Sequence, residues 1–282
     1  MIIFKHSKEV KNYLERQKPL KKKIGFVPTM GALHQGHLSL LKRSREICSI
    51  TVCSIFVNPT QFNNTMDFQK YPKTIENDIL LLEENGCDVL FLPDEKEIYP
   101  SEESKEKHFD LGYLETVLEG KFRPGHFQGV ALIVEKLINI VNPDSLFLGQ
   151  KDFQQCLVIK RLIEIMNKEI QLIICPIHRE ESGLAMSSRN VRLNSSERNL
   201  AAELHRALVS IERQLTKDNF LTLKNKAIND LQKKGFKVDY LELAKKNTLE
   251  LVSHFNEEDE LILLIAAFLG DVRLIDNLLI AA

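Results

Sequence analysis

Short apolar runs alternate with amphipathic helical stretches over about the first 190 of the 282 residues. Apolar runs bounded by turn residues are typical of buried strands, and their alternation with helices indicates a parallel sheet covered on both faces. We therefore expect an α/β, Rossmann-like doubly wound fold, in which ligands bind beyond the carboxyl ends of the strands. The expected strands are residues 24–27, 50–57, 88–92, 145–148 and 170–175, and the expected helices are residues 37–47, 74–85, 130–141 and 153–166.

The pattern changes after about Asn190. Helices followed by consecutive short strands are typical of an α+β arrangement and not of a parallel sheet. We therefore expect a Rossmann-like domain at residues 1–190 and a smaller α+β domain at residues 191–282. In the second domain the expected helices are residues 195–217 and 221–234, and the expected strands are residues 238–243, 261–267 and 272–275.

Opposite charges are almost balanced, with 38 Lys and Arg against 39 Asp and Glu and a net charge of -1 at pH 7. A nucleic-acid-binding protein usually carries a basic excess, so we expect no nucleic-acid partner. The longest apolar run, residues 261–269, falls well short of the roughly 20 residues that span a bilayer. The apolar start is shorter than the core of a secretory signal. We expect a soluble, cytoplasmic protein with no membrane partner.

The five cysteines contain no Cys-x-x-Cys pair, and their number is odd. A zinc site needs clustered ligands, and a disulfide framework usually needs an even number of cysteines. We expect buried, reduced thiols, which agrees with a reducing compartment.

The first expected strand runs directly into a loop, Pro-Thr-Met-Gly-Ala-Leu-His-Gln-Gly-His, at residues 28–37. Free backbone N–H groups at the start of a helix favour an anion. His34 and His37 are three residues apart, so they share one face of the first helical turn. Two imidazoles there can donate hydrogen bonds to a phosphate and to the charge that develops in its transition state. The loop therefore predicts a phosphate or nucleotide site.

The string His-Gln-Gly-His resembles the signature of the HIGH nucleotidyltransferase superfamily, whose members attack the α-phosphate of a nucleotide. The whole loop is similar to that of the pantothenate synthetase family (pantoate–β-alanine ligases) in particular. The same family resemblance extends, in order, to the loops after the later strands and covers nearly the whole chain. The matching strings are residues 28–37, 58–62, 123–130, 149–155, 186–189, 238–242 and 273–277, of which 186–189 (Met-Ser-Ser-Arg) is similar to the superfamily's mobile KMSKS-type loop.

The residue types in these loops suit a polyanionic ligand. Lys151 is a point charge suited to phosphates, and the guanidinium of Arg189 is always charged. Gln61 offers a neutral amide, which orients an anionic substrate without repelling it. Taken without the resemblance, the same residues are also consistent with polar loops and helix caps, with Asp152 as an N-cap.

The resemblance implies ATP-dependent ligation of (R)-pantoate and β-alanine to pantothenate, a step of coenzyme A biosynthesis. In the implied reaction, pantoyl adenylate and pyrophosphate form first, and the amine of β-alanine then displaces AMP. ATP is a substrate, and Mg²⁺ is implied as its metal ion. The resemblance also implies a homodimer and a carboxyl-terminal domain that closes over the active site.

The resemblance also implies roles for individual residues, each matched to a string of this sequence. The implied catalytic residues are His37, His34, Lys151 and Arg189. The implied ATP-binding residues are Met30, Gly31, His34, Gly36, His37, Gly149, Gln150, Lys151, Asp152, His178, Met186, Ser187, Ser188 and Arg189, with His178 standing where the family has a small apolar residue. The implied contacts of pantoate or β-alanine are Gln61, Gln155, Asn58, Arg123 and His126, and Asp78 is a metal candidate from its position alone.

Three other functions use part of the same pattern. A nucleotidyltransferase that keeps the nucleotide on its product would need only the His-x-Gly-His loop, but the pair Gln61 and Gln155 and the long second domain disfavour it. A fragment of a tRNA synthetase is disfavoured by the balanced charge. A non-catalytic nucleotide-binding module is disfavoured because the positions implied to be catalytic are intact.

Overall fold

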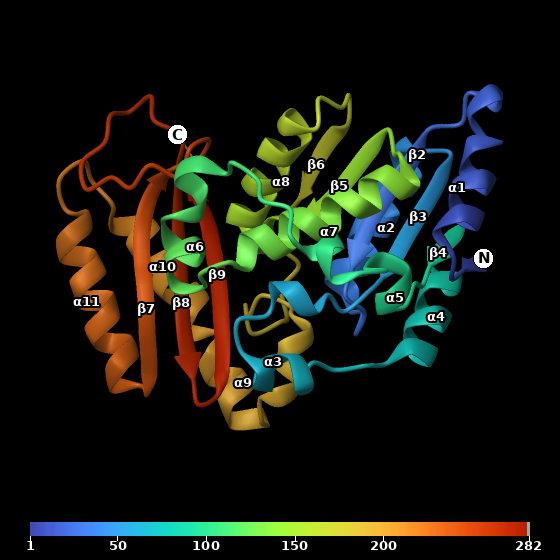
Figure 1. The fold of residues 1–282 in the computed structure, drawn as a ribbon. Coiled ribbons are helices and arrows are strands. Elements are labelled where there is room, and N and C mark those ends of the chain that lie inside the picture. Colours follow the sequence, from blue (N-terminus) through green and yellow to red (C-terminus); the bar gives the residue numbers. More distant parts are fainter. Residues whose placement is uncertain (281–282) are drawn as a thin grey trace. The chain divides into compact units, whose positions relative to one another are not determined.

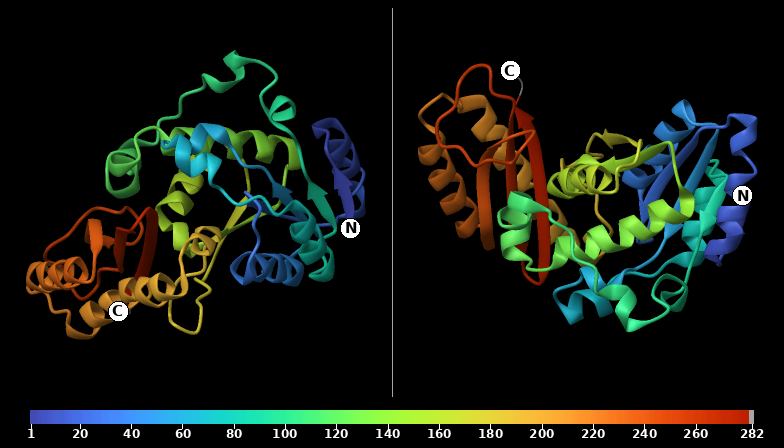
Figure 2. Two further views of the ribbon diagram at one scale, coloured as in Figure 1. Left: turned by 90° about the horizontal axis from the view of Figure 1, so that it is seen from below. Right: turned by 45° about the horizontal axis from the view of Figure 1, so that its top comes forward.

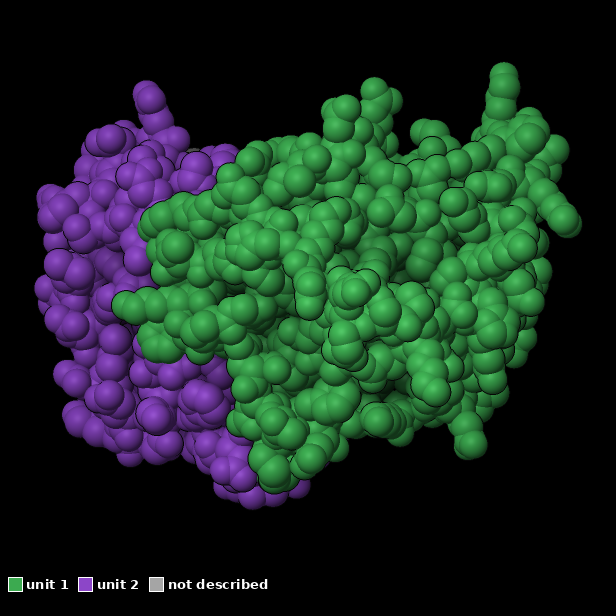
Figure 3. Space-filling view, in the orientation of Figure 1, with its two compact units in different colours: residues 1–149, 158–176 green, residues 150–157, 177–282 purple. Residues whose placement is uncertain are grey.

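A computed structural model, which describes residues 1–280, divides the chain into two compact units (Figure 3). Unit 1 comprises residues 1–149 and 158–176, and unit 2 comprises residues 150–157 together with those from 177 onward. Residues 177–190 thus fall in unit 2, whereas the expected domain boundary lies after Asn190; that domain division stays a prediction. Among the described residues, no helix is both long enough and apolar enough to cross a bilayer.

Unit 1 is built on a six-stranded parallel sheet with the strand order β1-β4-β3-β2-β5-β6 (Figure 1). Together with the covering helices, this sheet confirms the predicted Rossmann-like α/β fold. The strands are β1 (Ile2–Phe4), β2 (Ile24–Thr29), β3 (Ile50–Ile55), β4 (Val89–Phe91), β5 (Ser145–Gly149) and β6 (Gln171–Cys175).

Helices lie on both faces of this sheet, as Figure 2 shows. Helices α2 and α4 pack on one face, where Leu41 and Leu82 join a buried cluster with Val27, Cys53 and Phe147. Helices α1 and α7 contact each other on the opposite face. The helices of unit 1 are α1 (Ser7–Glu15), α2 (Gln35–Ile47), α3 (Thr65–Gln69), α4 (Ile75–Glu84), α5 (Glu95–Ile98), α6 (Leu118–Phe122), α7 (His126–Val141) and the later part of α8 (Phe153–Ile165).

The order of the strands reverses at β2. From β2 the chain proceeds through β3 and β4 on one side, whereas β5 and β6 extend the sheet on the other side. Strand β2 pairs in parallel with both β3 and β5. A reversal of this kind leaves room for a ligand outside the carboxyl ends of the strands, and β2 ends there at Thr29.

Unit 2 contains a three-stranded antiparallel sheet of order β7-β8-β9 and the helices α9, α10 and α11. Leucines at alternate positions of β8, such as Leu263, point to one face and pack against Leu208 of α10 and Leu231 of α11. This sheet and these helices confirm the expected small α+β element. The bounds are α9 (Ser195–Ala201), α10 (Glu203–Gln214), α11 (Phe220–Lys233), β7 (Phe236–Lys245), β8 (Leu261–Leu269) and β9 (Val272–Ile280).

The structure differs from the sequence prediction in several elements, among them the short helices α3, α5 and α6, which were not predicted. Strand β1 and helix α1 at the amino terminus were not predicted. The expected helix over residues 195–217 was wrong in its continuity, because α9 and α10 are separated by Ala202. Helix α10 also ends early, at Gln214, where the side chain of Asn219 bonds the Gln214 carbonyl oxygen and the N–H of Thr216.

Candidate active site

The loop after β2 is held in place by one buried carboxylate. Gly31 and Ala32 both adopt positive φ angles, of 80° and 49°. The backbone N–H groups of Ala32 and Leu33 donate to the two oxygens of Asp78, at 2.9 and 2.8 Å. The hydroxyl of Thr74 donates to the same carboxylate at 3.1 Å. The side chain of Asp78 is fully buried, so its hydrogen bonds fix the course of this loop.

His34 and His37 cap the helix that follows. The Nδ1 atom of His34 accepts a hydrogen bond from the N–H of Gly36 at 3.2 Å, and the Nδ1 atom of His37 accepts from the N–H of His34 at 3.3 Å. The two rings lie close, with centroids 4.1 Å apart. Because each Nδ1 atom is an acceptor, a neutral ring carries its proton on Nε2. The capping box therefore fixes both imidazoles at the amino end of α2.

The turn after β3 is organised by a buried amide. Asn58 is 1% exposed, and its oxygen accepts from the hydroxyl of Tyr99 at 2.9 Å. Its nitrogen donates to the Gly129 carbonyl oxygen at 3.1 Å and to Oε1 of Gln61 at 3.3 Å. Burial raises the pKa of Tyr99, which keeps its hydroxyl a donor. Asn58 thus orients Gln61, whose side chain is half-buried and also contacts Sδ of Met30.

Replacing Gly129 by alanine tests how closely α7 approaches this turn. A Cβ atom built on Gly129 would lie 2.3 Å from the carbonyl oxygen of Thr60 and 2.8 Å from the Cα atom of Gln61. Alanine stabilises a helix by about 1 kcal/mol relative to glycine, whereas overpacking typically costs about 1–3 kcal/mol. We therefore expect Gly129→Ala to lower the midpoint of thermal unfolding followed by circular dichroism.

Gly149→Ala is the matched control, because a Cβ atom built there meets no other atom within 4 Å. We expect its midpoint to stay at the wild-type value. A raised midpoint for Gly129→Ala would show that helix propensity outweighs the clash and that the turn is not tightly packed.

Arg123 and His126 both face groups of the protein. His126 is buried at the start of α7, and its Nδ1 atom lies 2.8 Å from the Gln61 carbonyl oxygen. Since a carbonyl oxygen only accepts, Nδ1 carries the proton there. Arg123 forms an ion pair with Glu119 at 3.5 Å. These contacts bring His126 to the Gln61 turn.

In unit 2, the segment that follows β5 forms a short turn before α8. Gln150–Asp152 is a 3-10 helix, and Nζ of Lys151 lies 3.6 Å from Oδ2 of Asp152. The side chain of Lys151 is 18% exposed. The carbonyl oxygens of Gln150 and Lys151 accept hydrogen bonds from Asn277 of β9, at 2.9 and 3.0 Å. Gln155 lies half-buried in the first turn of α8.

The remaining predicted nucleotide residues of unit 2 lie on a hairpin. The N–H of Met186 donates to the His178 carbonyl oxygen at 2.9 Å, so the two residues face each other across the hairpin. The side chain of His178 is exposed. At the hairpin's end, the hydroxyl of Ser187 accepts from the N–H of Arg189 at 3.3 Å and caps a 3-10 helix, Ser188–Arg192. The backbone therefore presents residues 186–189 as one short turn.

None of the five cysteines is arranged as a nucleophile. All are buried. Burial raises the pKa of Cys53 and of Cys175, and it raises the pKa of Cys87 to about 12. A thiolate is therefore unfavourable at these positions at neutral pH.

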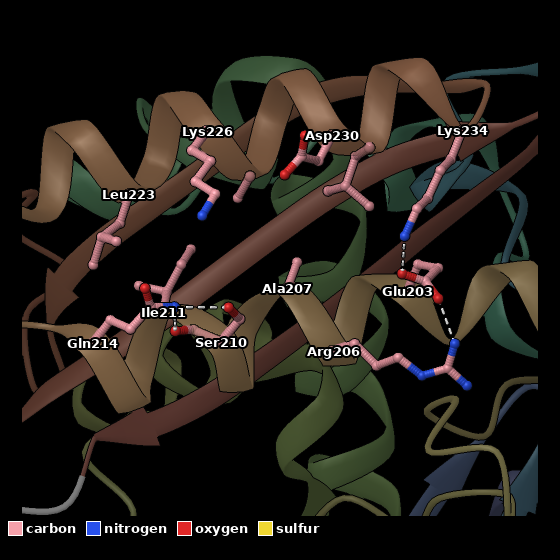
Figure 4. A pocket seen from close by; sticks show the side chains of 12 residues that line it. Glu203, Arg206, Ala207, Ser210, Ile211, Gln214, Leu223, Lys226, Asp230 and Lys234 are labelled. Carbon is pink, nitrogen blue, oxygen red and sulfur yellow. Dashed lines mark hydrogen bonds and ion pairs between the residues drawn. The ribbon is translucent and has the colours of Figure 1, made fainter.

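A groove in unit 2 between α10 and α11 is lined by none of the predicted site residues (Figure 4). Glu203 pairs there with both Arg206 and Lys234. Gln214 donates to the carbonyl oxygen and hydroxyl of Ser210. The charges of Glu203, Arg206 and Lys234 in this groove are therefore paired with one another.

Sequence reasoning missed the residues that support the site. Tyr99, Asp276 and Asn277 were given no role, and Asp78 was considered only as a metal ligand. One signal was present in the sequence: Asp276 and Asn277 are two adjacent polar residues inside an otherwise apolar run. Their partners, however, are about a hundred or more residues away in the chain.

Comparisons with known proteins agree with this geometry. The family model described as Pantoate-beta-alanine ligase matches residues 2–279. The chain is 45% identical to a pantothenate synthetase from Cytophaga hutchinsonii and 42% identical to one from Porphyromonas gingivalis, with 99% of both chains covered in each case.

Two solved structures resemble the whole chain. The crystal structure of pantothenate synthetase from Thermus thermophilus has a TM-score of 0.91 and 36% identity, and 100% of both chains is covered. The structure of pantoate-beta-alanine ligase from Francisella tularensis, complexed with beta-gamma ATP and beta-alanine, has a TM-score of 0.81 and 38% identity. That comparison covers 99% of this chain and 97% of the other.

Proposed function

Because the chain belongs to the pantoate–β-alanine ligase family, we propose that it joins (R)-pantoate to β-alanine in an ATP-dependent reaction that yields pantothenate. The observation that carries this proposal is the pair His34 and His37, whose imidazoles cap α2 directly after β2. An anion at this helix start meets two imidazoles and the positive end of the helix dipole together.

The reaction needs activation of a carboxylate, because its oxygen is a poor leaving group. The pantoate carboxylate attacks the α-phosphate of ATP and forms pantoyl adenylate and pyrophosphate. The amine of β-alanine then displaces AMP. Such phosphoryl chemistry depends mainly on positioning and on charge stabilisation. We assign His37 and His34 to the α-phosphate, with His37 as the donor to developing charge.

We propose that two sets of residues bind the nucleotide. The set in unit 1 follows β2, and the set in unit 2 comprises the turn before α8 and the hairpin. Lys151 and Arg189 supply positive charge to the phosphates, and the hydroxyls of Ser187 and Ser188 supply hydrogen bonds. The first set is Met30, Gly31, His34, Gly36 and His37, joined by Gly149 at the end of β5; the second is Gln150, Lys151, Asp152, His178, Met186, Ser187, Ser188 and Arg189.

We propose that Gln61 and Gln155 bind pantoate, and Gln61 also β-alanine, through neutral amides. The contacts of Asn58 support a positioning role, since its side chain is buried and bonded to protein groups. The contact of His126 with the Gln61 carbonyl oxygen supports the same role. Arg123, paired with Glu119, is proposed to add positive charge near the substrate.

We propose that Mg²⁺ accompanies ATP and is held chiefly by phosphate oxygens. Magnesium usually keeps several waters and takes one or two carboxylates plus substrate phosphates. Among residues 1–280, no group of three or more His, Cys, Asp or Glu side chains is arranged to hold a metal ion, which fits an ion carried by the nucleotide. The ion supplies charge neutralisation of the pyrophosphate. Asp78, buried with both oxygens bonded, fits a loop-holding role better than a metal site.

The proposal is tested by a complete assay with ATP, Mg²⁺, pantoate and β-alanine, from which each component is omitted in turn. We expect pantothenate and AMP in equal amounts, and only when both the acid and the amine are present. A product that retains the nucleotide would instead identify a nucleotidyltransferase. We also propose that the protein is cytoplasmic and forms a homodimer. Light scattering of the purified protein, which gives its molar mass in solution, tests the oligomeric state.

A further inference from the structure

Strand β9 carries two buried polar residues side by side in an apolar run. Asp276 is 4% exposed and Asn277 is 2% exposed. A buried polar side chain is costly unless it is hydrogen-bonded, and a buried carboxylate is more costly still. Adjacent residues of a strand point to opposite faces of its sheet, so the two side chains have separate partners. Both residues therefore need a role in the packing of unit 2.

Asn277 uses its whole amide to hold the turn that precedes α8. Its nitrogen donates to the carbonyl oxygens of Gln150 and Lys151, at 2.9 and 3.0 Å. Its oxygen accepts from Nε2 of Gln150 at 3.0 Å. The two hydrogen bonds to carbonyl oxygens fix the backbone on both sides of Lys151, and the third holds the side chain of Gln150. None of them constrains the lysine side chain itself.

Asp276 fixes the strand in the register that this contact requires. The guanidinium of Arg179 binds its carboxylate with two parallel hydrogen bonds, of 2.7 and 2.9 Å. The Asn277 N–H donates to Oδ1 of Asp276 at 2.7 Å, and its carbonyl oxygen accepts from Arg179 at 3.3 Å. Both backbone polar groups of Asn277 are thus satisfied on an edge strand of the sheet (Figure 1).

We propose that Asn277 is a positioning residue for ATP, which acts by holding the Gln150–Lys151 backbone so that Lys151 reaches the phosphates. This proposal rests on the proposed function of Lys151. Lysine is a point charge on a flexible side chain, and ordering it on binding costs free energy. A backbone that is already fixed lowers this cost, so more of the attraction between Lys151 and the phosphates contributes to ATP binding. Asn277 makes no contact with substrate in this role.

The test compares Asn277→Ala, Asn277→Asp and Lys151→Ala in the full chain. Isothermal titration calorimetry with ATP alone, in the absence of pantoate, gives the Kd for ATP. We expect Asn277→Ala to raise this Kd about 10-fold, because the hydrogen bonds that fix the lysine backbone are lost. Asn277→Asp keeps the shape and one acceptor but turns an oxygen toward two carbonyl oxygens, so we expect at least the same loss.

The double variant separates positioning from general destabilisation. If Asn277 acts through Lys151, then adding Asn277→Ala to Lys151→Ala should change the Kd for ATP by less than about twofold, since coupled residues are non-additive. In the assay of pantothenate formation, we expect Asn277→Ala alone to raise the KM for ATP and to leave the KM for β-alanine within about twofold of the wild-type value. Asn247→Ala, at an exposed asparagine of the same unit, is the matched control and should leave both values unchanged.

An unchanged Kd for ATP in folded Asn277→Ala would overturn the proposal. So would a Kd in the double variant that is raised by the product of the two single-variant factors. If Asn277→Ala does not fold, the Kd for ATP is measured on the isosteric Asn277→Asp instead, and an unchanged value there would likewise overturn the proposal. The calorimetric measurement needs no pantothenate to form. A wild-type protein that binds ATP but makes no pantothenate would therefore refute the proposed function. The Kd for ATP of the Asn277 variants would still decide whether Asn277 acts in ATP binding.

Discussion

We expect His37→Ala to slow the formation of pantoyl adenylate by a factor of about 10²–10³. Removal of a single donor that stabilises transition-state charge costs roughly this much in other enzymes. The hydrogen bond from the His34 N–H to Nδ1 of His37 leaves its Nε2 atom as the donor. The expected loss is therefore in the rate of the chemical step, which a single-turnover measurement of pyrophosphate release from ATP and pantoate reports without β-alanine.

His37 is also part of a helix cap, so its replacement has a second effect. Loss of a cap typically costs about 0.5–2 kcal/mol of stability. His37→Gln separates the two effects, because glutamine at this position can restore the capping box but not the imidazole. We expect His37→Gln to unfold at the wild-type midpoint and to remain slow. His108→Ala, at an exposed histidine of the same unit, should have neither effect, and a wild-type rate in His37→Ala would refute the catalytic role.

We expect Asp78→Ala to destabilise the protein by roughly 3 kcal/mol, since it leaves buried N–H groups without their charged acceptor. Those groups belong to Ala32 and Leu33, at 2.9 and 2.8 Å from the carboxylate. The loop that leads into His34 would lose the support that the Asp78 side chain of α4 gives it, so adenylation should slow as well. Chemical unfolding by urea, followed by circular dichroism, measures the change in stability.

The stability measurement also distinguishes a loop-holding residue from a metal ligand. In a buffer with EDTA, a metal ligand would leave the unfolding midpoint of Asp78→Ala equal to that of the wild type. A loop-holding residue lowers the midpoint with and without Mg²⁺. Glu76→Ala, at an exposed carboxylate on the same helix, is the matched control and should change the midpoint little. Equal midpoints for Asp78→Ala and the wild type in EDTA would contradict our assignment.

The sequence predicted the parallel sheet because buried strands and amphipathic helices have different periodicities. It predicted the loop of His34 and His37 for the same local reason, since strand, loop and helix are consecutive. Strand β1 was missed because three residues are too few to show a period. The break at Ala202 was missed because no glycine or proline marks it.

The supporting contacts could not be predicted because they join distant parts of the chain. Asp78 lies 46 residues beyond Ala32, and its sequence position alone does not tell a metal ligand from a loop anchor. Asn277 lies 127 residues beyond Gln150. A polar residue in an apolar strand signals that a partner exists, but only the fold identifies that partner.

The hydrogen bonds of Asn277 also bear on the order in which the protein matures. During synthesis, the turn at Gln150 and Lys151 leaves the ribosome more than a hundred residues before the strand that holds it. A nascent chain can complete the parallel sheet of unit 1 strand by strand, yet this turn lacks its partner until β9 emerges. A chain that lacks Asn277 would therefore leave the backbone of Gln150 and Lys151 without these hydrogen bonds. If Asn277 has the proposed positioning role, ATP binding depends on a strand that is made more than a hundred residues after the turn that it holds.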